Sequence, residues 1–87
     1  MAYRAVLLPS ADRALRKLER SVLRRVARRI DRLAADPRPP DAKPLKGEPA
    51  GVLRVRIGDW RLIYRVEEQV VTVVVIDVGH RSSIYRR

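Results

Sequence analysis

The stretch "LRVRIGDWRLIYRV", residues 53–66, places four arginines within two runs that otherwise have the composition of β-strands. Between the runs stands Gly58-Asp59, a two-residue linker of the kind that closes tight hairpins. With that loop, Ile57 pairs with Trp60, and each further pair follows outward along the two strands. The stretch therefore predicts a β-hairpin of defined register.

The predicted register determines where the charges lie. Side chains two residues apart in a strand share a face, and directly paired residues share it as well. Arg54, Arg56, Arg61 and Arg65 then lie on one face, with Arg56 opposite Arg61. Like charges opposed in this way are destabilising, and a bound phosphate would relieve them. The alternatives are a solvent-exposed face that prevents edge aggregation, or a register shifted by one residue.

The residues before the hairpin predict one strand and two helices. "YRAVLL" (3–8) has the length and composition of a strand that Pro9 ends, and Ser10 and Ser21 are candidate helix N-caps. Apolar residues then recur at helical spacing, at Ala11, Ala14, Leu15 and Leu18 and again at Leu23, Val26, Ala27, Ile30, Leu33 and Ala34. We expect two antiparallel amphipathic helices. The arginines on the other face of the second helix are either solvated or part of an RNA-facing surface.

The remaining segments complete an α+β domain. Residues 36–51 hold five of the six prolines, which predicts a long connector without regular structure. The run "VVTVVVIDV" (70–78) predicts a third strand of the meander, and a short basic tail follows it. The predicted order is β-α-α-β-β-β, with two helices packed against a small, mostly antiparallel sheet. We expect residues 1–87 to form a single domain.

The charge indicates a polyanionic partner. The chain has 20 Lys and Arg against 10 Asp and Glu, a net charge of +10 on 10.0 kDa. Most of the cations are Arg, whose planar fork suits bidentate phosphate contacts. One His and no Cys leave no residues for a metal cluster, and we expect no cofactor. Without a secretory signal or a membrane-length apolar run, we expect a cytoplasmic protein that does not bind membranes.

The tail adds groups that can transfer protons. His80, Arg81 and Tyr85 follow the third predicted strand, where we expect them to reach the arginine face. Histidine titrates near neutral pH, and tyrosine can stack on a base or donate a proton. A surface or hydrogen-bonded role is the alternative for His80. We expect Trp60 to pack with the core rather than with a nucleic-acid base, because it shares a face with Leu62.

The segments "KPLKGEPAGVLRVRIGDWRLIYRV" (43–66) and "VGHRSSIYR" (78–86) resemble the RelE/ParE superfamily of toxins from type II toxin–antitoxin systems. The resemblance comprises a "PLKG" turn, the arginine hairpin and a terminal "HRxxxY", and the upstream β-α-α order agrees with the RelE-like fold. It is closest to the RelE branch. That branch implies a ribosome-dependent, metal-independent mRNA endonuclease that cleaves A-site codons by attack of the ribose 2′-hydroxyl.

By motif position, the resemblance implies which residues form the site. Arg54 and Arg56 match the two basic residues of the first hairpin strand, and Arg61 matches the arginine that contacts phosphate. Arg81 matches the C-terminal arginine, and Tyr85 matches a tyrosine that stacks on a base or handles a proton. We also expect Lys43, Lys46 and Arg65 to bind substrate.

This chain departs from the best-studied pattern at the expected base. Arg54 and Arg56 stand where lysines occur in the RelE type, and Arg cannot act as a general base at neutral pH because its pKa exceeds about 12. Lys43 replaces a glutamate that is catalytic in related toxins. We therefore hypothesise that His80 or Tyr85 handles the proton while the arginines stabilise the phosphate.

Two other functions remain as alternatives. One is a ParE-like toxin that inhibits DNA gyrase by binding, and the other is an inactive toxin-fold binding module. Each of the toxin functions implies a partner protein. The resemblance implies an acidic, RelB-like antitoxin that covers the basic face in a hetero-oligomeric complex, which binds operator DNA through the antitoxin. For the nuclease, it implies mRNA and the A site of the 70S ribosome as further partners.

Overall fold

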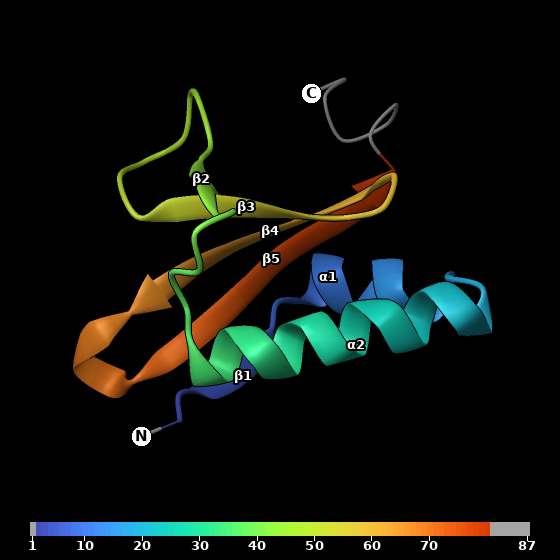
Figure 1. Ribbon diagram of the computed structural model, residues 1–87, viewed down its shortest axis with the longest axis horizontal. Helices are drawn as coiled ribbons and strands as arrows, with labels where there is room; N and C mark the ends of the chain where they lie inside the picture. The colour runs from blue at the N-terminus through green and yellow to red at the C-terminus, as the bar shows by residue number, and fades with distance from the viewer. Residues whose placement is uncertain (1, 81–87) are drawn as a thin grey trace.

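Five strands form one mixed sheet in the order β1-β5-β4-β3-β2 (Figure 1). The computed structural model describes residues 2–80. Along the chain the elements are β1 (Arg4–Leu7), α1 (Pro9–Arg16), α2 (Arg20–Ala35), β2 (Lys43–Pro44), β3 (Val52–Ile57), β4 (Trp60–Glu67), the 3₁₀ turn η1 (Glu68–Val70) and β5 (Thr72–His80). β1 runs parallel to β5, and every other neighbouring pair is antiparallel. The predicted α+β class is therefore confirmed.

Both helices lie on the same side of the sheet (Figure 1). Their apolar stripes pack against alternate residues of β3, β4 and β5, because only alternate side chains of a strand point to that side. Trp60 packs at the border of this core, as its strand position predicts. The buried members of the core are Ala11, Val26, Ile30, Leu33, Val55, Ile57, Leu62, Tyr64, Val73, Val75 and Val78. No helix within residues 2–80 is long and apolar enough to cross a membrane.

The hairpin has the predicted register. Ile57 pairs with Trp60, Arg56 with Arg61, and Val52 with Arg65. Gly58 adopts a φ of 62° at the first loop position, a left-handed value that a residue without a Cβ reaches at little cost. The local turn chemistry therefore fixes how β3 lies on β4.

The predicted helix caps are wrong. Pro9 begins α1 instead of only ending the strand, because its fixed φ suits the first helical position and its missing N–H is not needed there. Ser10 therefore lies inside the first turn, where its hydroxyl donates to the carbonyl of Ile76 at 2.6 Å. In α2 the N-cap is Glu19, and the Ser21 hydroxyl donates to the Glu19 carboxylate at 3.0 Å.

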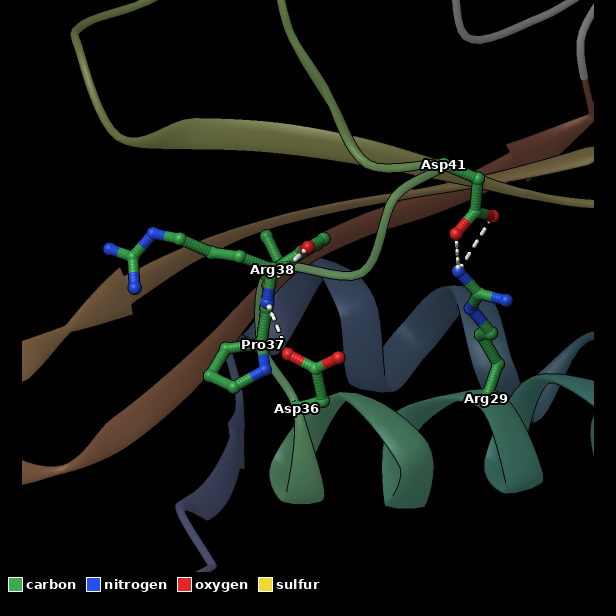
Figure 2. A network of polar contacts seen from close by, with 6 residues as sticks. Arg29, Asp36, Pro37, Arg38 and Asp41 are labelled. Carbon is green, nitrogen blue, oxygen red and sulfur yellow. Dashed lines mark hydrogen bonds and ion pairs between the residues drawn. The ribbon is translucent and has the colours of Figure 1, made fainter.

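Tyr64 and Arg29 both hold the proline-rich connector against the rest of the molecule. The buried Tyr64 hydroxyl donates to the carbonyl of Pro37 at 2.6 Å, and burial raises the pKa of Tyr64 to about 12. Nη2 of Arg29 lies 2.7 Å from each carboxylate oxygen of Asp41, and this hydrogen-bonded ion pair lowers the pKa of Asp41 (Figure 2). The Asp36 carboxylate also accepts the backbone N–H of Arg38 (Figure 2).

The connector also contains a strand that the sequence did not predict. Lys43 pairs with Arg54 and Pro44 with Leu53, so β2 forms one edge of the sheet. A proline is tolerated there because an edge strand leaves one row of backbone groups unpaired. The prediction that residues 36–51 lack regular structure is therefore wrong at these two residues.

The last strand begins and ends two residues later than predicted. Val70 belongs to η1, and Val71 has a φ of 48°, an uncommon conformation for a β-branched residue. This left-handed residue completes the turn, and β5 then runs from Thr72 to His80. Gly79 and His80 consequently belong to the sheet and not to the tail.

We expect Tyr64→Phe to lower the free energy of unfolding by about 1 kcal/mol, because it leaves the buried Pro37 carbonyl without its donor. Urea denaturation measures the change. Tyr3→Phe is the matched control, since it removes a hydroxyl that donates to an exposed Glu68 carboxylate. The stabilisation by the neutral Tyr64 phenol should be complete below about pH 10 and disappear as the pH rises through its raised pKa of about 12. An equal loss in both variants would contradict this role for Tyr64.

Candidate functional site

Basic side chains share the face of the hairpin that is opposite the helices. Val55, Ile57 and Leu62 are in the helix-side core, so the alternate residues of both strands point the other way. We call this side the open face. The hairpin arginines on it are Arg54, Arg56, Arg61 and Arg65, as the sequence predicts.

β2 adds a further cation to the open face. Lys43 is paired directly with Arg54, and cross-strand partners share a face. The face therefore carries two opposed pairs of like charge, Lys43–Arg54 and Arg56–Arg61. Like charges directly opposite one another in a sheet are destabilising, by a few tenths to about 1 kcal/mol.

The four arginines differ in their surroundings. Arg61, the second residue of β4, is only 7% exposed, so the surrounding protein limits the positions available to its side chain. Arg56 is exposed near the end of β3, and Arg54 is half-buried. Nε of Arg65 donates to the Glu67 carboxylate at 2.7 Å, so part of its charge is neutralised within the protein. Arg54 and Arg56 are therefore better candidates than Arg65 for contacting a phosphate, and Arg61 is the arginine with the most restricted position.

A small apolar cluster lies beside the arginines. Val52 and Ile63 are buried on the open face, with Leu45 of the connector and Ile76 of β5 packed against them. Leu45 belongs to the "PLKG" turn, so this turn is held next to the arginine pairs by apolar contact. Lys46 is exposed in the same turn and directly follows Leu45 in the sequence, so it lies close to the open face.

Asp77 is a residue of this face that the sequence analysis missed. It pairs with Ile63, whereas Arg61 pairs with Gly79 two residues further along β5, so Asp77 and Arg61 are diagonal neighbours on one face. Its Oδ1 accepts the backbone N–H of Val78 at 2.9 Å. A β-bulge between Ile63 and Tyr64 shifts the register at this point. A bulge of this kind has no clear signal in the sequence.

The expected placement of His80 is wrong. His80 pairs with Trp60 at the end of β5, on the side of the sheet that the helices cover. The two rings meet edge to face, with centroids 5.5 Å apart. His80 was expected in the tail, but it is the last residue of β5 because it pairs with Trp60.

Two predicted site residues, Arg81 and Tyr85, lie outside the described residues 2–80. No group of three His, Cys, Asp or Glu side chains able to hold a metal ion occurs in the part of the chain that is described. The described open face supplies fixed cations next to an apolar surface. Such a surface can bind a phosphate and stabilise negative charge that develops on it.

The sequence of this chain is similar to those of known toxins. The family model of the ParE toxin of the type II toxin–antitoxin system parDE matches residues 5–85. Toxin RelG of Mycobacterium tuberculosis is 49% identical over 45 residues, which are 52% of this chain and 52% of that protein. The match thus spans about half the length of this curated relative.

Solved structures show the same fold. The toxin–antitoxin complex RelBE2 of Mycobacterium tuberculosis contains a chain that is 34% identical, with a TM-score of 0.81 over 93% of this chain and 100% of that one. A chain of the intact RelBE toxin–antitoxin complex of E. coli is 28% identical, with a TM-score of 0.80 over 91% of this chain and 96% of that one.

We expect Arg56→Gln to raise the free energy of unfolding by a few tenths to about 1 kcal/mol, because it removes the repulsion with Arg61. Inorganic phosphate should stabilise the wild type more than this variant. Thermal unfolding with and without phosphate measures both effects. Arg65→Gln is the control on the same face, since Arg65 is opposite Val52 and pairs with Glu67. If Arg56→Gln were no more stable than Arg65→Gln, the pairing of Arg56 with Arg61 would not destabilise the folded protein.

Proposed function

This chain belongs to the ParE toxin family of type II toxin–antitoxin systems, within the RelE/ParE superfamily, and we propose that it is a ribosome-dependent mRNA endonuclease. The observation that supports this proposal is the pairing of like charges on the open face, Arg56 with Arg61 and Arg54 with Lys43. The repulsion between opposed like charges lowers the stability of the free protein, and a bound anion would relieve it. The site of action would be the A site of the 70S ribosome in the cytoplasm.

The proposed reaction needs fixed cations that stabilise the phosphate and a separate group that transfers a proton. The ribose 2′-oxygen attacks the adjacent phosphorus as it loses its proton, and the bond to the 5′-oxygen breaks. The products are a 2′,3′-cyclic phosphate and a 5′-hydroxyl that has gained a proton. Arg54, Arg56 and Arg61 would hold the phosphate and stabilise the negative charge of the pentacoordinate transition state. No metal ion is required for these steps.

A separate group must handle the proton, because guanidinium remains protonated at neutral pH. His80 and Tyr85 are the two candidates from the sequence. His80 lies on the side of the sheet opposite the arginines and packs against Trp60, so its position favours a structural role. We therefore assign the proton transfer to Tyr85, with Arg81 as a further phosphate contact.

Primer extension on a reporter mRNA tests the proposed activity. Purified protein is added to a translating extract, and the same mRNA is treated without ribosomes. We expect cuts in phase with codons that require ribosomes and disappear in Arg61→Ala and in Arg81→Ala. Cleavage that persists in both variants, or mRNA that stays intact with the wild type, would contradict the proposal.

The assignment of the proton carrier is tested with two variants. We expect Tyr85→Phe to slow cleavage by about 10²-fold or more, the usual contribution of general acid–base catalysis. His80→Gln, which keeps a hydrogen-bonding side chain beside Trp60, should cleave at close to the wild-type rate. Single-turnover cleavage on programmed ribosomes measures both rates. Loss of cleavage in His80→Gln but not in Tyr85→Phe would reverse the assignment.

The relatives support a cognate antitoxin as partner. The matching RelBE2 and RelBE structures are toxin–antitoxin complexes. For a chain of net charge +10 with exposed basic residues on the open face, an acidic RelB-like peptide would neutralise charge and block access to the arginines. The complex would be hetero-oligomeric and bind operator DNA through the antitoxin.

A second function is favoured by one observation, the match of residues 5–85 to the ParE toxin model. In that case the basic surface would inhibit DNA gyrase by binding, without cutting RNA. A gyrase supercoiling assay separates the two functions. Inhibition of supercoiling together with intact mRNA would support the ParE-like function over the nuclease, whereas an inactive binding module would affect neither.

A further inference from the structure

A basic groove lies between α2 and the end of β3, next to the hairpin turn. It has a volume of about 350 Å³. Its lining residues are Arg25, Arg28, Arg29, Arg32, Arg56, Ile57 and Gly58. We call it the α2 groove. It adjoins the open face through Arg56, which belongs to both.

The groove exists because β2 is so short. β2 pairs only with Leu53 and Arg54, so within residues 2–80 no strand pairs with the Val55–Ile57 half of β3 on that side. α2 lies below this part of the sheet (Figure 1). Its residues 25, 28, 29 and 32 share one helix face by their spacing of three and four. That face therefore meets the uncovered end of β3.

The hairpin turn leaves space for the side chain of an arginine of α2. A Cβ at Gly58 would lie 2.7 Å from Nη2 of Arg25, a distance at which Arg25 would have to move. The absence of a side chain at Gly58 thus lets the Arg25 guanidinium lie against the turn. This contact joins the helix wall of the groove to the hairpin.

Most of the groove arginines form no ion pair within residues 2–80. Among residues 2–80, the groove arginine that forms an ion pair is Arg29, and its partner is Asp41. Nε of Arg29 is buried and has no hydrogen-bond partner within the same residues. Arg25, Arg28 and Arg32 are exposed on the same helix face, where like charges at this spacing repel one another.

We propose that the α2 groove is a second binding site for the phosphodiester backbone of nucleic acid, distinct from the open face. Arginine forks form bidentate contacts with phosphate, and several in a row can follow a strand. Because Arg56 lines both surfaces, a strand bound at the open face can continue around the end of β3 into the groove. An acidic peptide fits less well, since Ile57 is the single apolar side chain among the lining residues and peptide interfaces need apolar anchors.

Asp41 is an internal competitor of the bound phosphate. Its carboxylate occupies one guanidinium nitrogen of Arg29 with both oxygens, at 2.7 Å each (Figure 2). Removing this carboxylate would free Arg29 for one more phosphate contact. The connector would then still be held by the Tyr64–Pro37 hydrogen bond, the Arg38–Glu68 ion pair and the pairing of β2 with β3.

The test compares two triple variants that lose the same charge. Arg25→Gln/Arg28→Gln/Arg32→Gln changes the groove and leaves Arg56 in place. Arg13→Gln/Arg20→Gln/Arg24→Gln changes exposed helix arginines outside the groove. The probes are fluorescent 2′-O-methyl RNAs, one single-stranded and one hairpin, which distinguish a flexible from a folded strand as the source of the phosphates. Because these probes have no free 2′-hydroxyl, the result does not depend on whether the toxin cleaves RNA.

We expect the groove variant to reduce the slope of log K against log salt by about 2 for the single-stranded probe, the value for three lost phosphate contacts. At 0.1 M salt its affinity should fall by about tenfold to a hundredfold. The control variant should change much less. Equal losses in both variants, or wild-type binding by the groove variant, would overturn the proposal. So would a loss of poly-glutamate binding with RNA binding unchanged, which would identify a surface for an acidic protein.

A single substitution tests the role of Asp41. Asp41→Asn should tighten RNA binding by several-fold and increase the salt slope by somewhat less than 1. Asp12→Asn, which removes the ion-pair partner of Arg16 in α1 outside the groove lining, is the control of equal charge. The same gain in both variants would mean that net charge and not the release of Arg29 is responsible, and would contradict this role.

Discussion

The two-residue turn at Gly58-Asp59 determines which side chains of β3 and β4 face the helices and which face away. It fixes β3 on β4, and in a sheet a shift of one residue would exchange the two faces of a strand. With the observed register, Val55, Ile57 and Leu62 enter the core while the hairpin arginines point away from the helices. The same glycine leaves room for Arg25, so the turn also connects the hairpin to α2. One local conformation thus positions both basic surfaces.

The distribution of charge opposes stability and favours binding. Like charges are opposed across strands on the open face and stacked along α2, and each arrangement costs free energy in the free protein. The apolar core between helices and sheet offsets this cost, and ties such as Tyr64–Pro37 and Arg29–Asp41 hold the connector in place. A bound anion would remove the repulsion, so both surfaces are expected to bind polyanions more strongly than isolated arginines would.

Local features of the sequence predicted the parts of the fold that have local causes. The hairpin register follows from its turn, the helices follow from their apolar spacing, and the resemblance to RelE/ParE toxins is confirmed. Features set by distant contacts were missed. The pairing of Lys43 with Arg54 depends on where the connector returns, and the face of His80 depends on its pairing with Trp60 and on the β-bulge between Ile63 and Tyr64. The spacing of the α2 arginines indicated a shared face, but not that this face meets the end of β3.

The central claim is that the hairpin arginines of the open face bind the RNA backbone. NMR spectra of the arginine Nε–Hε groups, recorded while an uncleavable 2′-O-methyl RNA is added, test it most directly. We expect the signals of Arg54, Arg56 and Arg61 to shift together and saturate, while that of Arg13 on the exposed side of α1 does not shift. Shifts confined to helix arginines, with the three hairpin signals unchanged, would contradict it.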